Sequence, residues 1–180
     1  SRSCVQRGGR FDLDRVAFIE AHGTGTRAGD PVECEAIARV LGAARRTSEP
    51  LYVGSIKTNI GHTEGAAGVA GLIKAALALH HRVVPASLHF ETPNPEIPWE
   101  SGRLAIPTAP VPLRQGAQLA GVSSFGLSGT NAHIVLESYE APESRRTEPR
   151  PTAFILPVSG HTPEALRQRA SSLAAHLSEP

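Results

Sequence analysis

Two histidines and a lysine lie in polar loops that follow short apolar segments of the chain. His22 opens the segment His-Gly-Thr-Gly-Thr directly after the apolar run 15–21, and Lys57 and His62 follow the run 51–55. Imidazole and ammonium groups can transfer protons and can stabilise negative charge that develops on an oxygen. In layered α/β proteins, such sites are built from loops beyond strand ends. The residue types and their placement therefore predict a site for proton transfer or for an anionic intermediate.

Short apolar runs predict the strands that must position these loops. Bounded by glycine and polar residues, they are typical of buried strands. The predicted strands are 15–21, 51–55, 104–106, 119–123, 132–137 and 154–158. A third glycine-rich loop, which begins at Phe125, joins two of these strands, and four prolines between Val84 and Trp99 indicate an extended connector.

Three helices accompany these strands. Asp30 is predicted to cap the first helix, with Pro31 at the first helical position and Glu33 reaching back to the cap. That helix is predicted to end near Gly42. The second helix has one apolar stripe at helical spacing, made by Val69, Leu72, Ile73, Ala76 and Leu77. Its other positions are largely Ala and Gly, which suits a helix packed between two layers, and the third helix spans 162–177.

Composition excludes several classes of protein. Lys plus Arg number 18 and Asp plus Glu 17, so the net charge of +1 gives no electrostatic case for a nucleic-acid or anionic-membrane surface. The longest stretch of small apolar residues, 65–79, contains Lys74 and is too short to span a bilayer. No secretory signal is visible at the N-terminus, so we expect a cytoplasmic protein. Two cysteines, Cys4 and Cys34, are too few for a disulfide scaffold or a cysteine-rich zinc module.

Two generic sites compete for the same loops. Residues 23–28 fit the dinucleotide-binding pattern G-x-G-x-x-G/A, but the helix-start signal at Asp30 lies beyond the glycines. Those glycines would not bring a pyrophosphate to a helix N-terminus. His22 and His62 could bind a metal with Glu20 or Glu64, but no third ligand is fixed, and we expect no metal.

The combination of loops is more specific than any of them alone. Residues 20–31 (Glu-Ala-His-Gly-Thr-Gly-Thr, then Gly-Asp-Pro) resemble the first histidine motif of the β-ketoacyl synthases, especially ketosynthase domains of modular type I polyketide synthases. Residues 54–68 resemble their lysine-plus-histidine motif, and residues 121–133 resemble their closing glycine-rich loop. Residues 157–166 are similar to the start of the linker between a ketosynthase and an acyltransferase.

The resemblance implies an α/β fold that is the C-terminal half of a thiolase-like layered structure. On this basis residues 1–139 form the ketosynthase half, 140–152 a linker, and 153–180 the truncated start of an α/β linker domain. The implied reaction of the parent enzyme is a decarboxylative Claisen condensation. In this reaction a malonyl-type extender on acyl carrier protein condenses with an acyl thioester held on a cysteine.

Roles for individual residues follow from the same resemblance. His22 and His62 are implied to be the histidine pair that stabilises the enolate, and Lys57 is implied to support them electrostatically. The backbone amide of Phe125 is implied to contribute to the oxyanion hole, and its ring to gate the acyl pocket. Thr24 and Thr26 match the threonines that bind the pantetheine amides. No dissociable cofactor is implied, only the phosphopantetheine arm of the carrier protein.

The chain departs from the family at the nucleophile. The family's cysteine lies upstream of the first histidine motif in a Thr-Ala-Cys-Ser-Ser type of turn, whereas Cys4 lies in Ser-Arg-Ser-Cys-Val-Gln. We therefore expect the isolated chain to be inactive and to expose a surface meant for an N-terminal half. The other expected partners are acyl carrier protein, a downstream acyltransferase and a second copy in a homodimer. The alternative is a non-catalytic fragment that binds carrier protein or a ketosynthase partner.

Overall fold

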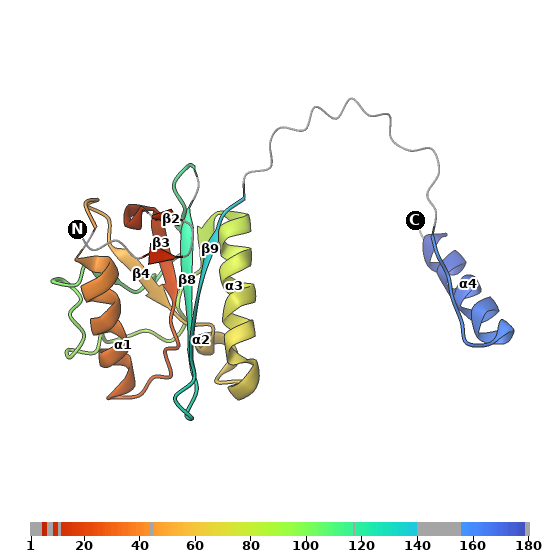
Figure 1. The fold of residues 1–180 in the computed structure, drawn as a ribbon, viewed down its shortest axis with the longest axis horizontal. Coiled ribbons are helices and arrows are strands. Elements are labelled where there is room, and N and C mark those ends of the chain that lie inside the picture. The colour runs from red at the N-terminus through yellow and green to blue at the C-terminus, as the bar shows by residue number, and fades with distance from the viewer. Residues whose placement is uncertain are drawn as a thin grey trace. The chain divides into compact units, whose positions relative to one another are not determined.

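The structure is a computed structural model that describes residues 5–6, 9–10, 12–43, 45–116, 118–139 and 156–178. The chain divides into two compact units, residues 1–141 and 142–180, which are drawn in Figure 1. The first unit carries all three loops singled out above. It opens with a short antiparallel hairpin of β1 (Val5–Gln6) and β2 (Gly9–Arg10).

A five-stranded mixed sheet forms the centre of the first unit. Its strand order is β6-β4-β3-β8-β9. The strands are β3 (Val16–Glu20), β4 (Leu51–Gly54), β6 (Leu104–Ala105), β8 (Leu119–Phe125) and β9 (Asn131–Glu137). β3 pairs in parallel with both β4 and β8, β4 pairs in parallel with β6, and β9 runs antiparallel to β8. The carboxyl ends of β3, β4 and β8 therefore lie at the same edge of the sheet.

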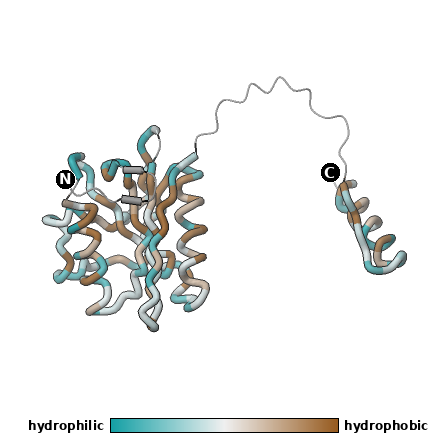
Figure 2. The backbone as a smooth tube through the Cα atoms, in the orientation of Figure 1, coloured by the Kyte–Doolittle hydropathy of each residue, from teal (hydrophilic) through white to brown (hydrophobic). Residues whose placement is uncertain are grey.

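Helices cover both faces of this sheet (Figure 1). α1 (Gly29–Ile37), continued by the π-helical turn η2 (Ala38–Gly42), packs on one face over a core that includes Ile19, Leu51 and Leu119. α3 (Ala67–His81) packs on the other face with Phe18, Ala120 and Val122. Figure 2 shows hydrophobic residues along the strands and along α3. The predicted mixed sheet covered by helices is confirmed.

The first helix begins differently from the prediction. α1 starts at Gly29, and the residue before it, Ala28, makes no side-chain capping bond. Instead the Thr26 hydroxyl accepts from the Gly29 N–H at 3.1 Å. The prediction that Asp30 caps the helix and that Glu33 closes a capping box is wrong, because both carboxylates bind amides of the preceding loop. Gly42 does end the helical segment, as predicted.

α3 packs small residues against the sheet and leaves three of its large apolar residues exposed. Ala67, Gly71, Ala75 and Ala78 are buried. Val69, Ile73 and Leu77 are 60%, 55% and 51% exposed. A Cβ added to Gly71 would lie 3.0 Å from Cγ of Glu20, so the helix approaches the sheet closely at this glycine. Most of the apolar stripe predicted from the sequence is therefore exposed in the described residues of the first unit, whereas one of its members, Leu72, packs against the core.

Short elements connect the main strands and helices. The segment 57–60, predicted as a loop, is the one-turn helix α2 (Lys57–Ile60), and η3 (Glu64–Ala66) leads into α3. The 3₁₀ turn η1 (Leu13–Arg15) precedes β3. β5 (Val83–Val84) and β7 (Val111–Pro112) form a small antiparallel pair at the two ends of the segment 83–112, which includes the proline-rich connector and β6.

The second unit is described from Leu156 and contains α4 (Pro163–Leu177). Thr162 caps this helix through its hydroxyl, which accepts from the Ala165 N–H at 3.1 Å, so the predicted third helix is confirmed. Residues 156–158 form no strand, and the rest of the strand predicted at 154–158 lies outside the described residues, as does the predicted linker 140–152. None of the described helices is long and apolar enough to cross a membrane.

The contact between η2 and the connector gives a test of the packing. A Cβ at Gly42 would lie 2.0 Å from the backbone oxygen of Gly102, so G42A must displace main chain. We expect a loss of about 1–3 kcal/mol in the free energy of unfolding, measured by urea denaturation of the intact protein that carries this chain. G65A is the matched control, because a Cβ there meets nothing within 4 Å. Equal midpoints for the two variants would contradict this packing.

Candidate active site

Three loops meet where the parallel strands end. His22 follows β3, His62 follows β4 through α2, and Phe125 is the last residue of β8. The imidazole rings of His22 and His62 lie edge to face, with centroids 5.5 Å apart and an interplanar angle of 85°. The rings of His22 and Phe125 have centroids 5.4 Å apart. The fold thus brings together three of the residues that the sequence singled out.

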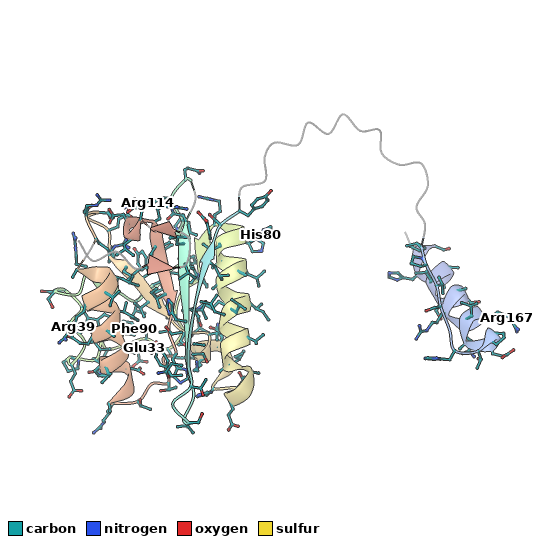
Figure 3. All side chains as sticks on the ribbon, in the orientation of Figure 1. Glu33, Arg39, His80, Phe90, Arg114 and Arg167 are labelled. Carbon is teal, nitrogen blue, oxygen red and sulfur yellow. The ribbon has the colours of Figure 1, made fainter. Side chains whose placement is uncertain are left out.

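Carboxylates of α1 hold the loop that carries His22. The two oxygens of Glu33 accept from the backbone N–H groups of His22 at 2.8 Å and of Gly23 at 2.9 Å. Glu33 is buried between α1 and the sheet (Figure 3). Asp30 accepts from the Gly25 N–H at 3.1 Å. Sequence spacing identified both acids but assigned them to helix capping, because it could not show which amides they face.

Lys57 and His62 are held by the turn that follows β4. Ile56, immediately before α2, donates its backbone N–H to Oε1 of Glu20 at 2.5 Å. α2 ends at Ile60, and the following Gly61 has a φ of 74°, which glycine readily adopts and which turns the chain toward His62. Lys57 is half-buried, whereas His62 is exposed. Glu20 therefore belongs to the support of this site, a role that the sequence did not indicate.

Hydrogen bonds to the ring nitrogens favour the same tautomer in both histidines. Nδ1 of His62 accepts from the Glu64 N–H at 3.0 Å, and Nδ1 of His22 accepts from the Phe125 N–H at 3.4 Å. A neutral imidazole with an accepting Nδ1 carries its proton on Nε2. Both Nε2–H groups are then donors that could bind one oxygen. The Phe125 amide, expected at an oxyanion hole, faces His22 in this structure.

Burial and nearby charge favour a neutral His22. Burial lowers the pKa of His22, and Lys57 and His62 lower it further, while Asp30 opposes them. Burial also lowers the pKa of Lys57, against the attraction of Glu20, Glu33 and Asp30. A neutral imidazole beside an ammonium group can donate a hydrogen bond to a developing oxyanion, which the lysine charge also stabilises.

Thr24 and Thr26 lie on the outer side of the first loop. Oγ1 of Thr26 accepts from Gly29, and it lies 3.5 Å from Oγ1 of Thr24. Thr26 is exposed and Thr24 partly so. Each hydroxyl keeps an O–H donor or an acceptor lone pair for a ligand amide. Because Thr26 accepts from Gly29, the first residue of α1, it also helps to start that helix.

Other groups that could do chemistry are placed less favourably. Within the described part of the chain, no group of three or more His, Cys, Asp and Glu side chains could hold a metal ion. Cys34 is buried in α1, and burial together with Glu33 and Asp30 raises the pKa of its thiol to about 12. Cys4 lies outside the described residues.

The environment of Cys34 predicts its reactivity. Because its pKa is raised, the thiolate that reacts with alkylating agents is scarce at pH 8. We expect the peptide that contains Cys34 to remain unlabelled by iodoacetamide in native protein and to be labelled after denaturation. Peptide mapping by mass spectrometry measures this. Rapid labelling of Cys34 in folded protein would show that it is accessible and ionised.

Comparison with known proteins places the chain in a family. The family described as "Beta-ketoacyl synthase, C-terminal domain" matches residues 5–91, and that described as "Ketoacyl-synthetase C-terminal extension" matches residues 93–180. The third motif, which includes Phe125, falls within the second match. Together the two matches span almost the whole chain.

Similar proteins are polyketide synthases. The chain is 48% identical over 166 residues to erythronolide synthase EryA3 of Saccharopolyspora erythraea, a match that covers 90% of this chain and 5% of that protein. It is 46% identical over 175 residues to the phenolphthiocerol synthesis polyketide synthase type I Pks15/1 of Mycobacterium marinum, a match that covers 90% of this chain and 8% of that protein. The chain therefore spans only a small part of these relatives.

Solved ketosynthases share the fold. The ketosynthase from module 6 of the bacillaene synthase of Bacillus subtilis 168 is 42% identical, with a TM-score of 0.67 over 71% of this chain and 24% of that one. Ketosynthase twelve of the bacillaene polyketide synthase of Bacillus amyloliquefaciens is 38% identical, with a TM-score of 0.70, and the match covers 92% of this chain and 28% of that one. The chain thus belongs to the β-ketoacyl synthase family, whose C-terminal domain and extension it carries.

Proposed function

We propose that this chain supplies the histidine and lysine side of a ketosynthase active site in a modular type I polyketide synthase. The proposed reaction of the intact enzyme is a decarboxylative Claisen condensation. The observation that carries this proposal is the pairing of His22 and His62. The centroids of their rings lie 5.5 Å apart, and both Nδ1 atoms accept hydrogen bonds from backbone N–H groups. Two neighbouring imidazoles with Nε2–H donors could together stabilise the oxygen of an enolate intermediate.

The proposed chemistry uses these donors in two steps. The malonyl thioester loses carbon dioxide when its C–C bond to the carboxylate breaks. The electron pair then forms an enolate, whose oxygen accepts hydrogen bonds from His22 and His62. The enolate carbon next attacks the carbonyl carbon of an acyl thioester, and the cysteine thiolate leaves. Lys57 stabilises the negative charge electrostatically, and the lowered pKa of His22 keeps that imidazole neutral.

The acyl chain must be held on a cysteine from outside the described residues. Cys34 is unsuited, because it is buried and its pKa is raised to about 12. We infer that an N-terminal ketosynthase half supplies the nucleophile and covers the stripe of Val69, Ile73 and Leu77 on α3, which would otherwise expose apolar surface to water. The isolated chain is then inactive and poorly stable.

The remaining proposed partners follow from the same reaction. Acyl carrier protein brings the extender on its phosphopantetheine arm, whose amides need hydroxyl partners at the entrance of the site. Thr24 and Thr26 are the proposed partners, since both lie on the outer side of the His22 loop. A downstream acyltransferase and a homodimeric assembly complete the proposed context.

Replacing His62 tests the central role. In the intact enzyme, H62A removes one of the two oxyanion donors, and we expect malonyl decarboxylation to fall about 100- to 1,000-fold. The measurement is carbon dioxide release from malonyl carrier protein. H80A is the control, because His80 is exposed near the end of α3 and lies outside the site. Unchanged decarboxylation by H62A would remove His62 from the mechanism.

Reconstitution tests the requirement for a second half. We expect the 180-residue chain alone to give no condensation product, and its co-expression with an N-terminal ketosynthase half to restore condensation. Product on carrier protein, detected by intact-protein mass spectrometry, is the readout. Binding of carrier protein without condensation in the reconstituted protein would instead support a non-catalytic binding fragment.

A further inference from the structure

A buried ion pair lies directly beneath the proposed site. Glu20, the last residue of β3, is 1% exposed, and its Oε2 lies 2.6 Å from Nζ of Lys74 on α3. The side chain of Lys74 is 12% exposed. The other carboxylate oxygen, Oε1, accepts from the Ile56 N–H at 2.5 Å. One carboxylate thus connects β3, α3 and the turn that begins α2.

The fold leaves room for this carboxylate at a glycine. A Cβ at Gly71 would lie 3.0 Å from Cγ and 3.5 Å from Oε1 of Glu20. Gly54 similarly lies next to Lys74, with its added Cβ 3.7 Å from Nζ. Burying two charges costs free energy that their attraction does not always recover. An apolar pair could fill the same space, so the pair calls for a reason beyond packing.

The position of Glu20 in the chain suggests that reason. Glu20 lies two residues before His22, and the amide that it binds belongs to Ile56, immediately before Lys57. The same carboxylate therefore ties the strand that leads to His22 to the helical turn that carries Lys57 and leads to His62. Glu20 is also the leading carboxylate among those that attract the Lys57 ammonium.

We propose that Glu20, held in place by its ion pair with Lys74, is a positioning residue for the condensation site. It fixes the start of α2 through the Ile56 amide and so sets Lys57 and His62 against His22. Lys74 anchors the carboxylate from α3 and balances its charge. This inference rests on the proposed ketosynthase function, because it concerns the geometry of the same histidine pair.

Two double variants of the intact enzyme separate positioning from stability. E20M/K74M replaces both charges by apolar side chains of similar length and leaves the Ile56 amide without its acceptor. E20Q/K74M also removes both charges but keeps an oxygen that can accept from Ile56. We expect both to fold, because neither leaves an unpaired buried charge, and we expect E20M/K74M to melt somewhat below the wild type, because its Ile56 amide has lost its acceptor. E35Q is the control, since Glu35 pairs with Arg39 on the exposed side of α1.

The expected kinetic results differ between the two variants. For E20M/K74M we expect kcat for malonyl decarboxylation to fall about 10- to 100-fold with little change in KM, as small misplacements of catalytic groups do. E20Q/K74M should recover most of that loss, and E35Q should match the wild type. A purely structural pair would give wild-type kcat in folded E20M/K74M, with any change confined to its melting temperature, and that result would overturn the proposal.

Two further outcomes are decisive. If E20M/K74M does not fold, G71A is the alternative test. The added methyl group would lie 3.0 Å from Cγ of Glu20, so the Glu20 side chain must shift to accommodate it. Unchanged kcat in G71A would then overturn the positioning role. If the wild-type enzyme decarboxylates malonyl carrier protein, and H62A abolishes this activity while E20M/K74M leaves it unchanged, this inference alone is refuted. Wild-type enzyme without any decarboxylation refutes both this inference and the proposed function.

Discussion

The parallel pairing of β3 with β4 and β8 is the constraint on which the rest of the site depends. Parallel strands end at the same edge of a sheet, so the loops that follow them meet even though they are far apart in sequence. His22, His62 and Phe125 come from three such loops. β9 is the outermost strand next to β8, and it runs antiparallel to β8, so it carries the chain away from the edge at which Phe125 lies.

Buried carboxylates convert that meeting of loops into a defined geometry. Glu33 binds two amides of the His22 loop, and Glu20 binds the amide before Lys57. Burial raises the pKa of both acids, while amide hydrogen bonds, and for Glu20 the ion pair with Lys74, oppose this rise. The two carboxylates thus orient the backbone of the loops, while the lowered pKa of His22 keeps its imidazole available as a neutral donor.

α3 has two different faces. Its small residues let it approach the sheet closely enough for Lys74 to reach Glu20, and three of its large apolar residues, Val69, Ile73 and Leu77, are exposed. A helix with both properties suits the centre of a layered protein, with one layer on each side. This chain spans about a quarter of the solved ketosynthases to which it is similar.

The sequence by itself determined the main elements and the chemical types at the site. Apolar runs located the core strands, and glycine-rich loops located His22, Lys57 and His62, because periodicity and turn chemistry are local properties. Two predictions from the sequence were wrong: Asp30 and Glu33 do not cap a helix but bind amides of the preceding loop, and residues 57–60 form a helix rather than a loop. Only the tertiary structure decided which amides the acids bind, which ring nitrogens accept hydrogen bonds, and that Glu20 meets Lys74. The contacts from Glu20 to Lys74 and from Phe125 to His22 join residues distant in the chain, and their geometry depends on strand order and helix packing, which no local pattern contains.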